Sequence, residues 1–205
     1  MPKVCIINGD VAYHKMFNTM GWSSVHNPKD ADVIQFTGGA DVSPQLYGEA
    51  LHPTSQCNLA RDDREKEIYD KWRGKKHLAG ICRGGQFLNV MAGGSMYQHH
   101  SGHPSLHEAW VYADMLKVLV SSTHHQIMRP AREGIVLMGA AEGVLAERMN
   151  GDAIVREPPE YETEAVHYPD LGVLCFQPHP EFAVRDKRVE DCMSIYFKFL
   201  EELMR

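Results

Sequence analysis

The sequence feature that most constrains the fold is a cysteine at the junction between an apolar strand and a helix. Residues 76–81 (KHLAGI) have the pattern of a short buried strand, and residues 86–91 (QFLNVM) begin a helix with apolar residues at helical spacing. Cys82 lies at the turn, and Gly80 and Gly84 allow the strained backbone of a nucleophile elbow. The N–H groups and the dipole of the helix start favour a thiolate. The pattern therefore predicts a cysteine nucleophile.

A candidate for proton transfer follows in residues 176–181 (FQPHPE), directly after an apolar strand at residues 172–176. His179 and Glu181 lie in an extended, proline-restrained segment, so their side chains can point to the same side. The carboxylate can then fix the tautomer of the imidazole. Each motif alone is modest evidence for catalysis, but together they predict a catalytic set of Cys82, His179 and Glu181.

The residues above resemble those of the class I glutamine amidotransferases. Within them the chain is most similar to the γ-glutamyl hydrolase branch, which includes the γ-glutamyl-γ-aminobutyrate hydrolases. The likeness spans nearly the whole chain. Besides the two motifs it includes residues 37–44 (TGGADVSP), 46–49 (LYGE), Arg61-Asp62 with Glu65, Asn89-Val90 with Gly93-Gly94, 122–126 (STHHQ) and 164–166 (EAV).

Composition agrees with an enzyme of this kind. At 205 residues and 43% apolar content, the chain is expected to form one domain over residues 1–205. No stretch approaches the roughly 18 apolar residues of a membrane span, and no signal peptide is visible before the first strand. Five cysteines without tight spacing indicate a reducing compartment, so a cytoplasmic location is expected. The net charge of −6 argues against a nucleic-acid partner.

The order of the expected elements predicts an α/β fold. Strands are expected at residues 3–7, 32–36, 78–81, 116–121 and 172–176, with helices between several of them. The resemblance implies a mostly parallel central sheet flanked by helices in a flavodoxin-like, three-layer arrangement. Asn150-Gly151 predicts a small antiparallel hairpin between residues 144–148 and 153–156. The C-terminal helix is expected to pack on the sheet through the stripe Val189, Cys192, Met193, Tyr196, Phe199, Leu200 and Leu203.

The resemblance implies cleavage of a γ-glutamyl amide through a γ-glutamyl thioester. Cys82 attacks the carbonyl, His179 transfers the proton to the departing amine and then activates water, and Glu181 orients the imidazole. The expected oxyanion hole consists of the backbone N–H groups of Gly39 and Arg83, the residue after the nucleophile. Glycine at position 39 lets the main chain approach the substrate closely. The expected substrate is glutamine or another small γ-glutamyl compound.

The resemblance implies that Gln86 contacts the γ-glutamyl group of the substrate. It also implies that Ser122, Thr123 and His124 receive the α-amino and α-carboxylate ends of that group. From the sequence alone, Gln86 could equally be an exposed helix residue and His124 a loop histidine. No cofactor is expected.

A metal site at the cluster formed by His99, His100, His103 and His107 is disfavoured. A spacing of four places histidines on one face only within a helix, and Gly102 and Pro104 would break that helix. No cysteine or close carboxylate completes a tetrahedral set of ligands.

The sequence departs from the family pattern at three places. Thr37 stands where a proline often precedes the paired glycines, and Gln98-His99 replaces the common glutamine–aspartate pair. Pro178 replaces the aromatic residue that usually precedes the H-P-E segment, which could reshape the wall of the pocket. The chain is also short for the hydrolase branch, so the resemblance does not identify the leaving amine.

Two versions of this chemistry remain open. The protein can hydrolyse a γ-glutamyl amine or peptide alone, or it can deliver ammonia from glutamine to a separate synthetase partner. A third alternative is a catalytically silent binding or regulatory module that keeps the fold. The related chaperone-like and deglycase proteins with an elbow cysteine are disfavoured by the H-P-E segment at residues 179–181.

Overall fold

The computed structural model describes residues 1–101, 104–140, 144–160 and 162–205. The helices are α1 (Val11–Thr19), α2 (Leu59–Trp72), α3 (Arg83–Met91) and α4 (Glu190–Leu203), with short 3-10 helices at Pro28–Asp30, Pro44–Tyr47, Pro169–Leu171, Pro180–Val184 and Lys187–Val189. The strands are β1 (Lys3–Ile7), β2 (Ser23–Ser24), β3 (Val33–Phe36), β4 (His77–Ile81), β5 (Ser95–Tyr97), β6 (His99–His100), β7 (Leu106–Val111), β8 (Leu116–Ser121), β9 (Ile127–Arg129), β10 (Ile135–Ala140), β11 (Ala146–Asn150), β12 (Ala153–Glu157), β13 (Thr163–Tyr168) and β14 (Val173–Phe176).

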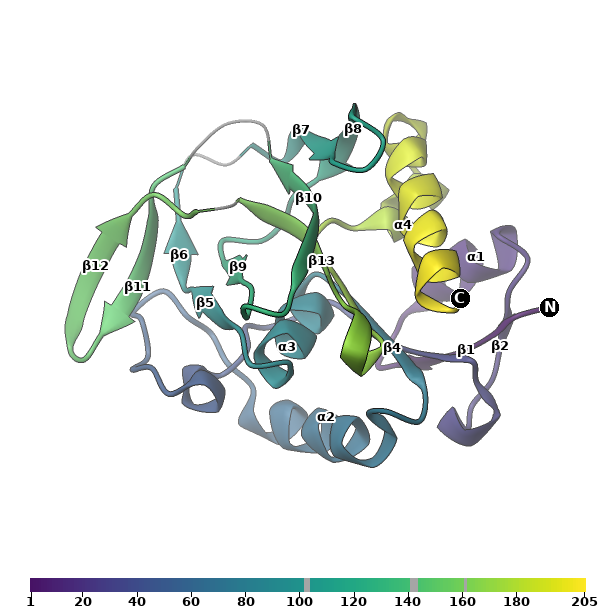
Figure 1. Cartoon of the computed structure of the whole chain (residues 1–205), viewed down its shortest axis with the longest axis horizontal. Helices are drawn as coiled ribbons and strands as arrows, with labels where there is room; N and C mark the ends of the chain where they lie inside the picture. The colour runs from purple at the N-terminus through teal and green to yellow at the C-terminus, as the bar shows by residue number, and fades with distance from the viewer. Residues whose placement is uncertain (102–103, 141–143, 161) are drawn as a thin grey trace.

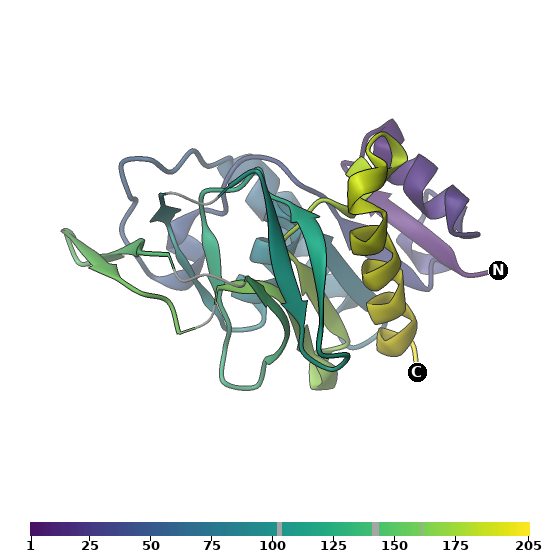
Figure 2. The same ribbon diagram turned by 90° about the horizontal axis from the view of Figure 1, so that it is seen from above.

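A large mixed sheet runs through the molecule in the order β2-β1-β3-β4-β14-β13-β10-β7-β8. The first five of these strands pair in parallel. From β14 onward each strand pairs with its neighbour in antiparallel fashion. A smaller antiparallel sheet, β12-β11-β6, carries the β11–β12 hairpin at the end of the molecule far from the N-terminus (Figures 1 and 2).

Helices cover both faces of the parallel half of the sheet (Figure 1). Side chains of α1 and α4 pack in one apolar cluster on one face, and those of α2 and α3 pack in a second cluster on the other. Strands β3 and β14 are therefore buried along their whole length, as expected for parallel strands covered twice. Among the helices in the described ranges, none is long and apolar enough to cross a membrane.

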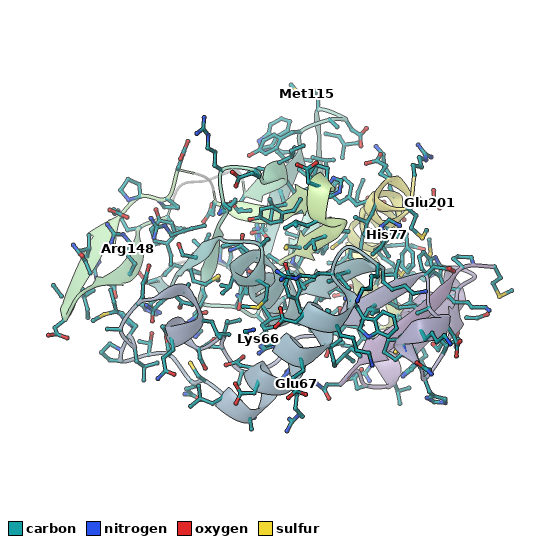
Figure 3. All side chains as sticks on the ribbon, turned by 60° about the horizontal axis from the view of Figure 1, so that its bottom comes forward. Lys66, Glu67, His77, Met115, Arg148 and Glu201 are labelled. Carbon is teal, nitrogen blue, oxygen red and sulfur yellow. The ribbon has the colours of Figure 1, made fainter. Side chains whose placement is uncertain are left out.

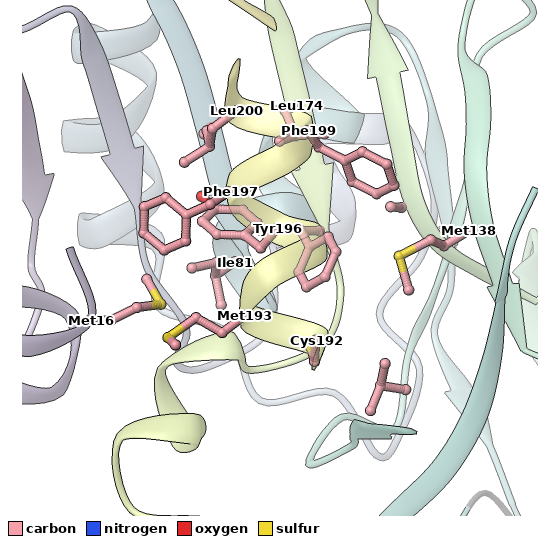
Figure 4. Packing of buried hydrophobic residues seen from close by; sticks show 14 of the residues in the cluster. Met16, Ile81, Met138, Leu174, Cys192, Met193, Tyr196, Phe197, Phe199 and Leu200 are labelled. Carbon is pink, nitrogen blue, oxygen red and sulfur yellow. The ribbon is translucent and has the colours of Figure 1, made fainter. Parts of the chain in front are cut away.

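The C-terminal helix α4 packs on the sheet through the stripe that the sequence predicts. All seven of the predicted stripe residues are buried. Figure 4 shows Tyr196 and Phe199 pointing toward the sheet, and the Phe176 ring of β14 lies 5.0 Å from the Tyr196 ring. This helix holds β14, and with it the segment that carries His179, against the rest of the sheet.

The predicted fold class is confirmed, and three local expectations need correction. The antiparallel part is larger than the single expected hairpin, because β7, β8, β10 and β13 extend the main sheet in antiparallel order. The hairpin loop consists of Gly151-Asp152, with Asn150 paired to Ala153, so the turn lies one residue later than expected. Helix α3 begins at Arg83 rather than Gln86, directly after the elbow.

Helix α3 lies unusually close to the sheet because its contact positions carry no side chain. A Cβ atom on Gly84 would lie 2.5 Å from the carbonyl carbon of Phe36, and one on Gly85 would lie 2.8 Å from the backbone nitrogen of Phe176. A Cβ atom on Gly80 would lie 2.3 Å from the Gly84 backbone. All of these neighbours are main-chain atoms that cannot rotate away, so glycine is required for this packing.

Substitution of Gly84 by alanine should therefore destabilise the protein. Overpacking against backbone typically costs about 1–3 kcal/mol, so we expect Gly84→Ala to lower the urea midpoint by a corresponding amount. Glu67, which is exposed on α2 (Figure 3), provides the control. Glu67→Ala should leave the free energy of unfolding within about 0.5 kcal/mol of the wild type. Equal midpoints for the two variants would contradict the close seating of α3.

Candidate active site

Three neighbouring parallel strands deliver the candidate site residues to one edge of the sheet. Thr37 follows β3, Cys82 follows β4, and the segment containing His179 follows β14. Phe36 pairs with Gly80 and Phe176 pairs with Ile81, so the carboxyl ends of these strands lie side by side. Open α/β sheets place their ligands at this edge.

Cys82 occupies a strained elbow between β4 and α3. Its φ of 52° and ψ of −117° lie in a region that residues other than glycine rarely adopt. The turn is held by the hydrogen bond from the Cys82 N–H to the carbonyl oxygen of Phe176, at 2.7 Å. The side chain is nearly buried, with 7% exposed, and it lies at the N-terminus of α3 as the sequence predicts.

His179 and Glu181 form a buried pair beside the elbow. His179 Nδ1 lies 2.6 Å from Glu181 Oε1, and the two residues are 8% and 3% exposed. The backbone of His179 is fixed by Ser121, whose Oγ accepts from the His179 N–H at 3.1 Å. A Cβ atom built on Gly38 would lie 3.1 Å from His179 Cε1 and 3.6 Å from Cys82 Cβ. The structure thus brings the three predicted residues together around one point.

The electrostatics of His179 favour an imidazolium. Burial by itself lowers the pKa of His179, but the hydrogen bond and charge of Cys82, followed by those of Glu181, outweigh it and raise the pKa to about 10. At neutral pH the proton therefore resides on His179. Burial raises the pKa of the four other cysteine thiols, namely Cys5, Cys57, Cys175 and Cys192, and so disfavours their thiolates.

Two aromatic residues that the sequence analysis missed contact this pair. The Phe182 ring stacks on the His179 ring with centroids 4.6 Å apart and planes 8° apart, which fixes the ring and favours its cationic form. The Tyr13 hydroxyl accepts from the Gly38 N–H at 3.0 Å, and burial followed by the charge of Glu181 raises the pKa of Tyr13. Phe182 could have been suggested by its position directly after the H-P-E segment, whereas no sequence signal connects α1 to this site.

The two predicted oxyanion donors lie in the loop after β3 and at the start of α3. Gly39 has a φ of 146°, and a Cβ atom there would lie 2.2 Å from Arg61 Nη1, so only glycine fits. Arg83 is the first residue of α3, where a backbone N–H has no partner within its helix. Both donors belong to segments that follow the carboxyl ends of neighbouring strands, β3 and β4.

The predicted substrate residues occupy different environments. Gln86 is buried, with its Nε2 donating to Gln177 Oε1 at 3.1 Å, so the alternative of an exposed helix residue is wrong. The Thr123 hydroxyl lies 2.8 Å from His179 Nε2, the ring nitrogen away from Glu181. Ser122 is buried. His124 lies in the loop before β9, with Nδ1 2.8 Å from the carbonyl oxygen of Gln126.

A group of histidines lies beside the loop that carries Gly39. His99 Nδ1 is 3.4 Å from His125 Nδ1, and His125 Nε2 is 3.1 Å from Asp41 Oδ2. Burial and then the neighbouring His125 lower the pKa of His99. The group borders a cavity of about 350 Å³ lined by Ala40, Asp41, Thr54, Gln56, His99 and His125.

The histidine spacing that prompted the metal hypothesis does not lie on a helix. His99 and His100 form strand β6, His107 lies in β7, and His103 is outside the described residues. In the described ranges, no group of three or more histidine, cysteine or carboxylate side chains has the geometry to hold a metal ion.

Comparison with known proteins identifies the family. Residues 26–181 match the family model of Peptidase C26. Protein NtpR of Enterococcus hirae is 36% identical over 122 residues, which cover 48% of this chain and 51% of that protein. A Lactococcus lactis protein, YvdE, whose name describes it as glutamine amidotransferase-like, is 29% identical over 174 residues, covering 73% of this chain and 66% of its own. The chain thus spans about half to two thirds of these curated relatives.

The solved structures that resemble this chain share its fold. PurLQS from Thermotoga maritima superposes with a TM-score of 0.66 at 18% identity, covering 98% of this chain and 99% of that chain. A glutamine amidotransferase from Thermotoga maritima gives a TM-score of 0.58 at 15% identity, covering 98% of this chain and 84% of its own. Together with the family match over most of the chain, this similarity shows that the protein belongs to the Peptidase C26 family and has the fold of the class I glutamine amidotransferases.

Proposed function

We propose that the protein hydrolyses a γ-glutamyl amide bond through a γ-glutamyl thioester on Cys82. The observation that carries the proposal is the pairing of the elbow cysteine with a buried His179 whose pKa is raised to about 10. Such a pair supplies a thiolate nucleophile and a general acid before the substrate arrives. The family match and the glutamine amidotransferase-like relatives support this class of hydrolase.

The first half of the reaction forms the thioester. The Cys82 sulfur attacks the γ-carbonyl carbon, and the carbonyl oxygen becomes an oxyanion that accepts from the N–H groups of Gly39 and Arg83. One such donor typically contributes about 10²–10³-fold in rate. The C–N bond then breaks as His179 gives its proton to the departing amine, a contribution of about 10²–10⁴-fold. The imidazole is left neutral.

The second half releases glutamate. His179 removes a proton from a water molecule, whose oxygen attacks the thioester carbonyl, and the same two N–H groups hold the oxyanion again. Collapse expels the Cys82 thiolate and leaves the imidazolium, which restores the starting state. Glu181 keeps Nδ1 protonated at its 2.6 Å contact, so Nε2 is the nitrogen that exchanges the proton. Thr123, 2.8 Å from Nε2, can hold the ring in line between steps.

Substrate binding is proposed at Gln86, Ser122, Thr123 and His124. Gln86 lies one helical turn after the nucleophile, with its N–H donating to the Cys82 carbonyl oxygen at 2.9 Å, so its side chain starts on the same face of α3. The loop at residues 122–124 is anchored to the site through the Thr123 contact with His179. These positions suit the polar α-amino and α-carboxylate ends of a γ-glutamyl group.

A second candidate function is a glutaminase subunit that delivers ammonia to a synthetase. Relatives whose names describe them as glutamine amidotransferase-like support this alternative. The segments at residues 37–44 and 46–49 favour the free-standing hydrolase, since they resemble that branch. A catalytically silent module is disfavoured by the complete arrangement of Cys82, His179 and Glu181.

The two functions differ in what the purified chain does alone. We expect it to release glutamate from a panel containing glutamine and several γ-glutamyl amines, and to prefer at least one γ-glutamyl amine over glutamine by kcat/KM. A glutaminase subunit would stay nearly inactive until its synthetase completes the site. Negligible release from every compound, rescued by a co-purifying synthetase, would establish the second function instead.

Selective labelling tests the nucleophile. A chloroketone analogue of glutamine should alkylate Cys82 rapidly at neutral pH, because burial raises the pKa of the other four thiols. Peptide mass spectrometry locates the adduct, and Cys57→Ser serves as the matched control because Cys57 is the most exposed of those four. Labelling that survives in Cys82→Ala, or that disappears in Cys57→Ser, would show that the assignment is wrong.

The roles of the pair predict an order of severity. Glu181→Gln is expected to retain about 10- to 100-fold more turnover than Cys82→Ala, because the carboxylate orients the ring without exchanging the proton. Glu181 also raises the pKa of His179, so its neutral replacement should lower that pKa. The alkaline limb of kcat/KM, near pH 10 in the wild type, should therefore move to lower pH. An unmoved limb, or a folded Glu181→Gln as inactive as Cys82→Ala, would contradict this role.

A further inference from the structure

A buried group of charges lies beneath the proposed oxyanion hole. Helix α2 supplies Arg61, Asp62 and Glu65, and the elbow helix supplies Arg83. Asp62, Glu65 and Arg83 are 1%, 0% and 1% exposed, so all three are removed from water. Two guanidinium groups face two carboxylates, which leaves the group neutral and makes its burial tolerable. The sequence motif formed by the three α2 residues has no role in the chemistry described above.

Arg61 connects this group to the loop that carries Gly39. Its Nε donates to Glu65 Oε1 at 2.7 Å, which holds the guanidinium plane in place. Its Nη1 donates to the Gly38 carbonyl oxygen and its Nη2 to the Thr37 carbonyl oxygen, both at 2.8 Å. One rigid guanidinium therefore binds two consecutive carbonyls of the loop through its Nη atoms, and its Nε–H binds the carboxylate.

The grip on Gly38 decides where the Gly39 N–H points. The Gly38–Gly39 peptide is trans and planar, so its C=O and its N–H point in opposite directions. Because Arg61 holds the carbonyl oxygen on the α2 side, the Gly39 N–H is directed away from α2. The N–H of Gly38 already donates to the Tyr13 hydroxyl at 3.0 Å. Among the described residues, none accepts a hydrogen bond from the Gly39 N–H, which leaves it available.

Helix α2 also holds Arg83, the residue that carries the second donor. The Arg83 side chain reaches back to α2, with Nη1 donating to Glu65 Oε2 and Nη2 to Asp62 Oδ1. Arg83 thus presents its backbone N–H at the elbow while its side chain is fixed to the residues that hold Arg61. Asp62 Oδ2 in turn accepts from the Ser43 N–H at 3.2 Å. Ser43, later in the loop that carries Gly39, is therefore held to α2 as well.

We propose that Arg61, held by Glu65, is a positioning residue that aims the Gly39 N–H and sets its separation from the Arg83 N–H. The inference rests on the proposed acyl-transfer function for the identity of the two donors. Glu65 is the shared element, because one of its oxygens holds the Arg61 guanidinium and the other holds that of Arg83. The oxyanion hole is then a preorganised pair whose spacing is determined outside the pocket.

The substitution Arg61→Lys distinguishes positioning by the guanidinium from an effect of positive charge alone. An ammonium group keeps the positive charge next to Glu65, but a single nitrogen cannot reproduce the planar fork across two carbonyls and a carboxylate. Arg61→Lys should therefore keep the buried group near neutral while freeing the Gly38–Gly39 peptide to rotate. A misplacement of this kind can cost up to about 10²-fold in a step that depends on the oxyanion.

The experiment compares two reactions of the same sulfur. Acylation by p-nitrophenyl acetate passes through a tetrahedral oxyanion as the thiolate attacks the ester carbonyl and p-nitrophenolate leaves. Alkylation by iodoacetamide is a displacement of iodide that forms no oxyanion. Both rates are measured at Cys82 by peptide mass spectrometry, with Cys82→Ala as the background. We expect Arg61→Lys to lower acylation by about 10-fold or more and to leave alkylation within about 2-fold of the wild type.

The matched control lies on the outer face of the same helix. Lys66 and Asp70 form an exposed pair at 2.6 Å with the same spacing of four as Arg61 and Glu65, and Figure 3 marks Lys66 on α2. Lys66→Gln should change neither rate. If Arg61→Lys does not fold, the neutral double variant Arg61→Met/Glu65→Gln is measured instead, since it leaves no new unpaired charge, and the same selective loss is expected.

Two results would overturn the proposal. Acylation at the wild-type rate would show that Arg61 does not aim the donor, and an equal loss of acylation and alkylation would show that it acts on the thiolate or on the fold. Neither reaction uses a γ-glutamyl substrate. A wild type that fails to hydrolyse any γ-glutamyl amide would therefore refute the proposed function while the ratio of the two rates still decides the role of Arg61.

Discussion

The close seating of α3 on the parallel sheet is the constraint on which the rest of the site depends. Without side chains at Gly80, Gly84 and Gly85, the helix approaches main-chain atoms of β3, β4 and β14. That approach leaves no room for an ordinary strand-to-helix loop. The chain therefore turns at Cys82 alone, which adopts a strained backbone conformation with a φ of 52°. The sulfur is thereby placed at the edge where β3 brings the paired glycines and β14 brings His179. The close packing of α3 on the sheet therefore brings together three segments that are distant in sequence.

Charge compensation then allows polar groups to function in a buried site. His179 is nearly buried, which alone would favour neutral imidazole, yet its raised pKa shows that its anionic neighbours prevail. Phe182 covers one face of the ring and Glu181 holds Nδ1, so the imidazolium is both stabilised and oriented. The charged group at α2 is compensated in the same way, because two arginines face two carboxylates. Both groups exclude water without leaving an isolated charge.

The parts of the site that could be predicted from sequence are those whose signal is local. The elbow around Cys82 and the segment holding His179 and Glu181 are each short patterns with a fixed backbone consequence, and the structure brings them together. Gln86 could not be placed, because α3 is buried from Arg83 to Val90 and its apolar periodicity does not reveal how much of its polar face is covered. The larger antiparallel region was missed because strand pairing depends on partners far along the chain.

Residues that act across elements left no sequence signal of their role. Tyr13 meets the glycine loop only because α1 packs beside the sheet, and Thr123 meets His179 only because β8 leads to the end of β14. Arg61 was visible as part of a motif, but its purpose depends on which carbonyls its guanidinium faces. Contacts of this kind are properties of the packed fold, and a sequence pattern can indicate that such a residue matters without saying what it touches.

The most direct measurement is the protonation state of His179, followed by NMR of its imidazole carbons against pH in the wild type and in Cys82→Ala. A thiolate–imidazolium pair predicts that His179 remains protonated through neutral pH and loses its proton near pH 10, and that removal of the thiol lowers this value. A wild-type His179 that titrates near pH 6.5, as a free histidine does, would contradict the pair and with it the proposed mechanism.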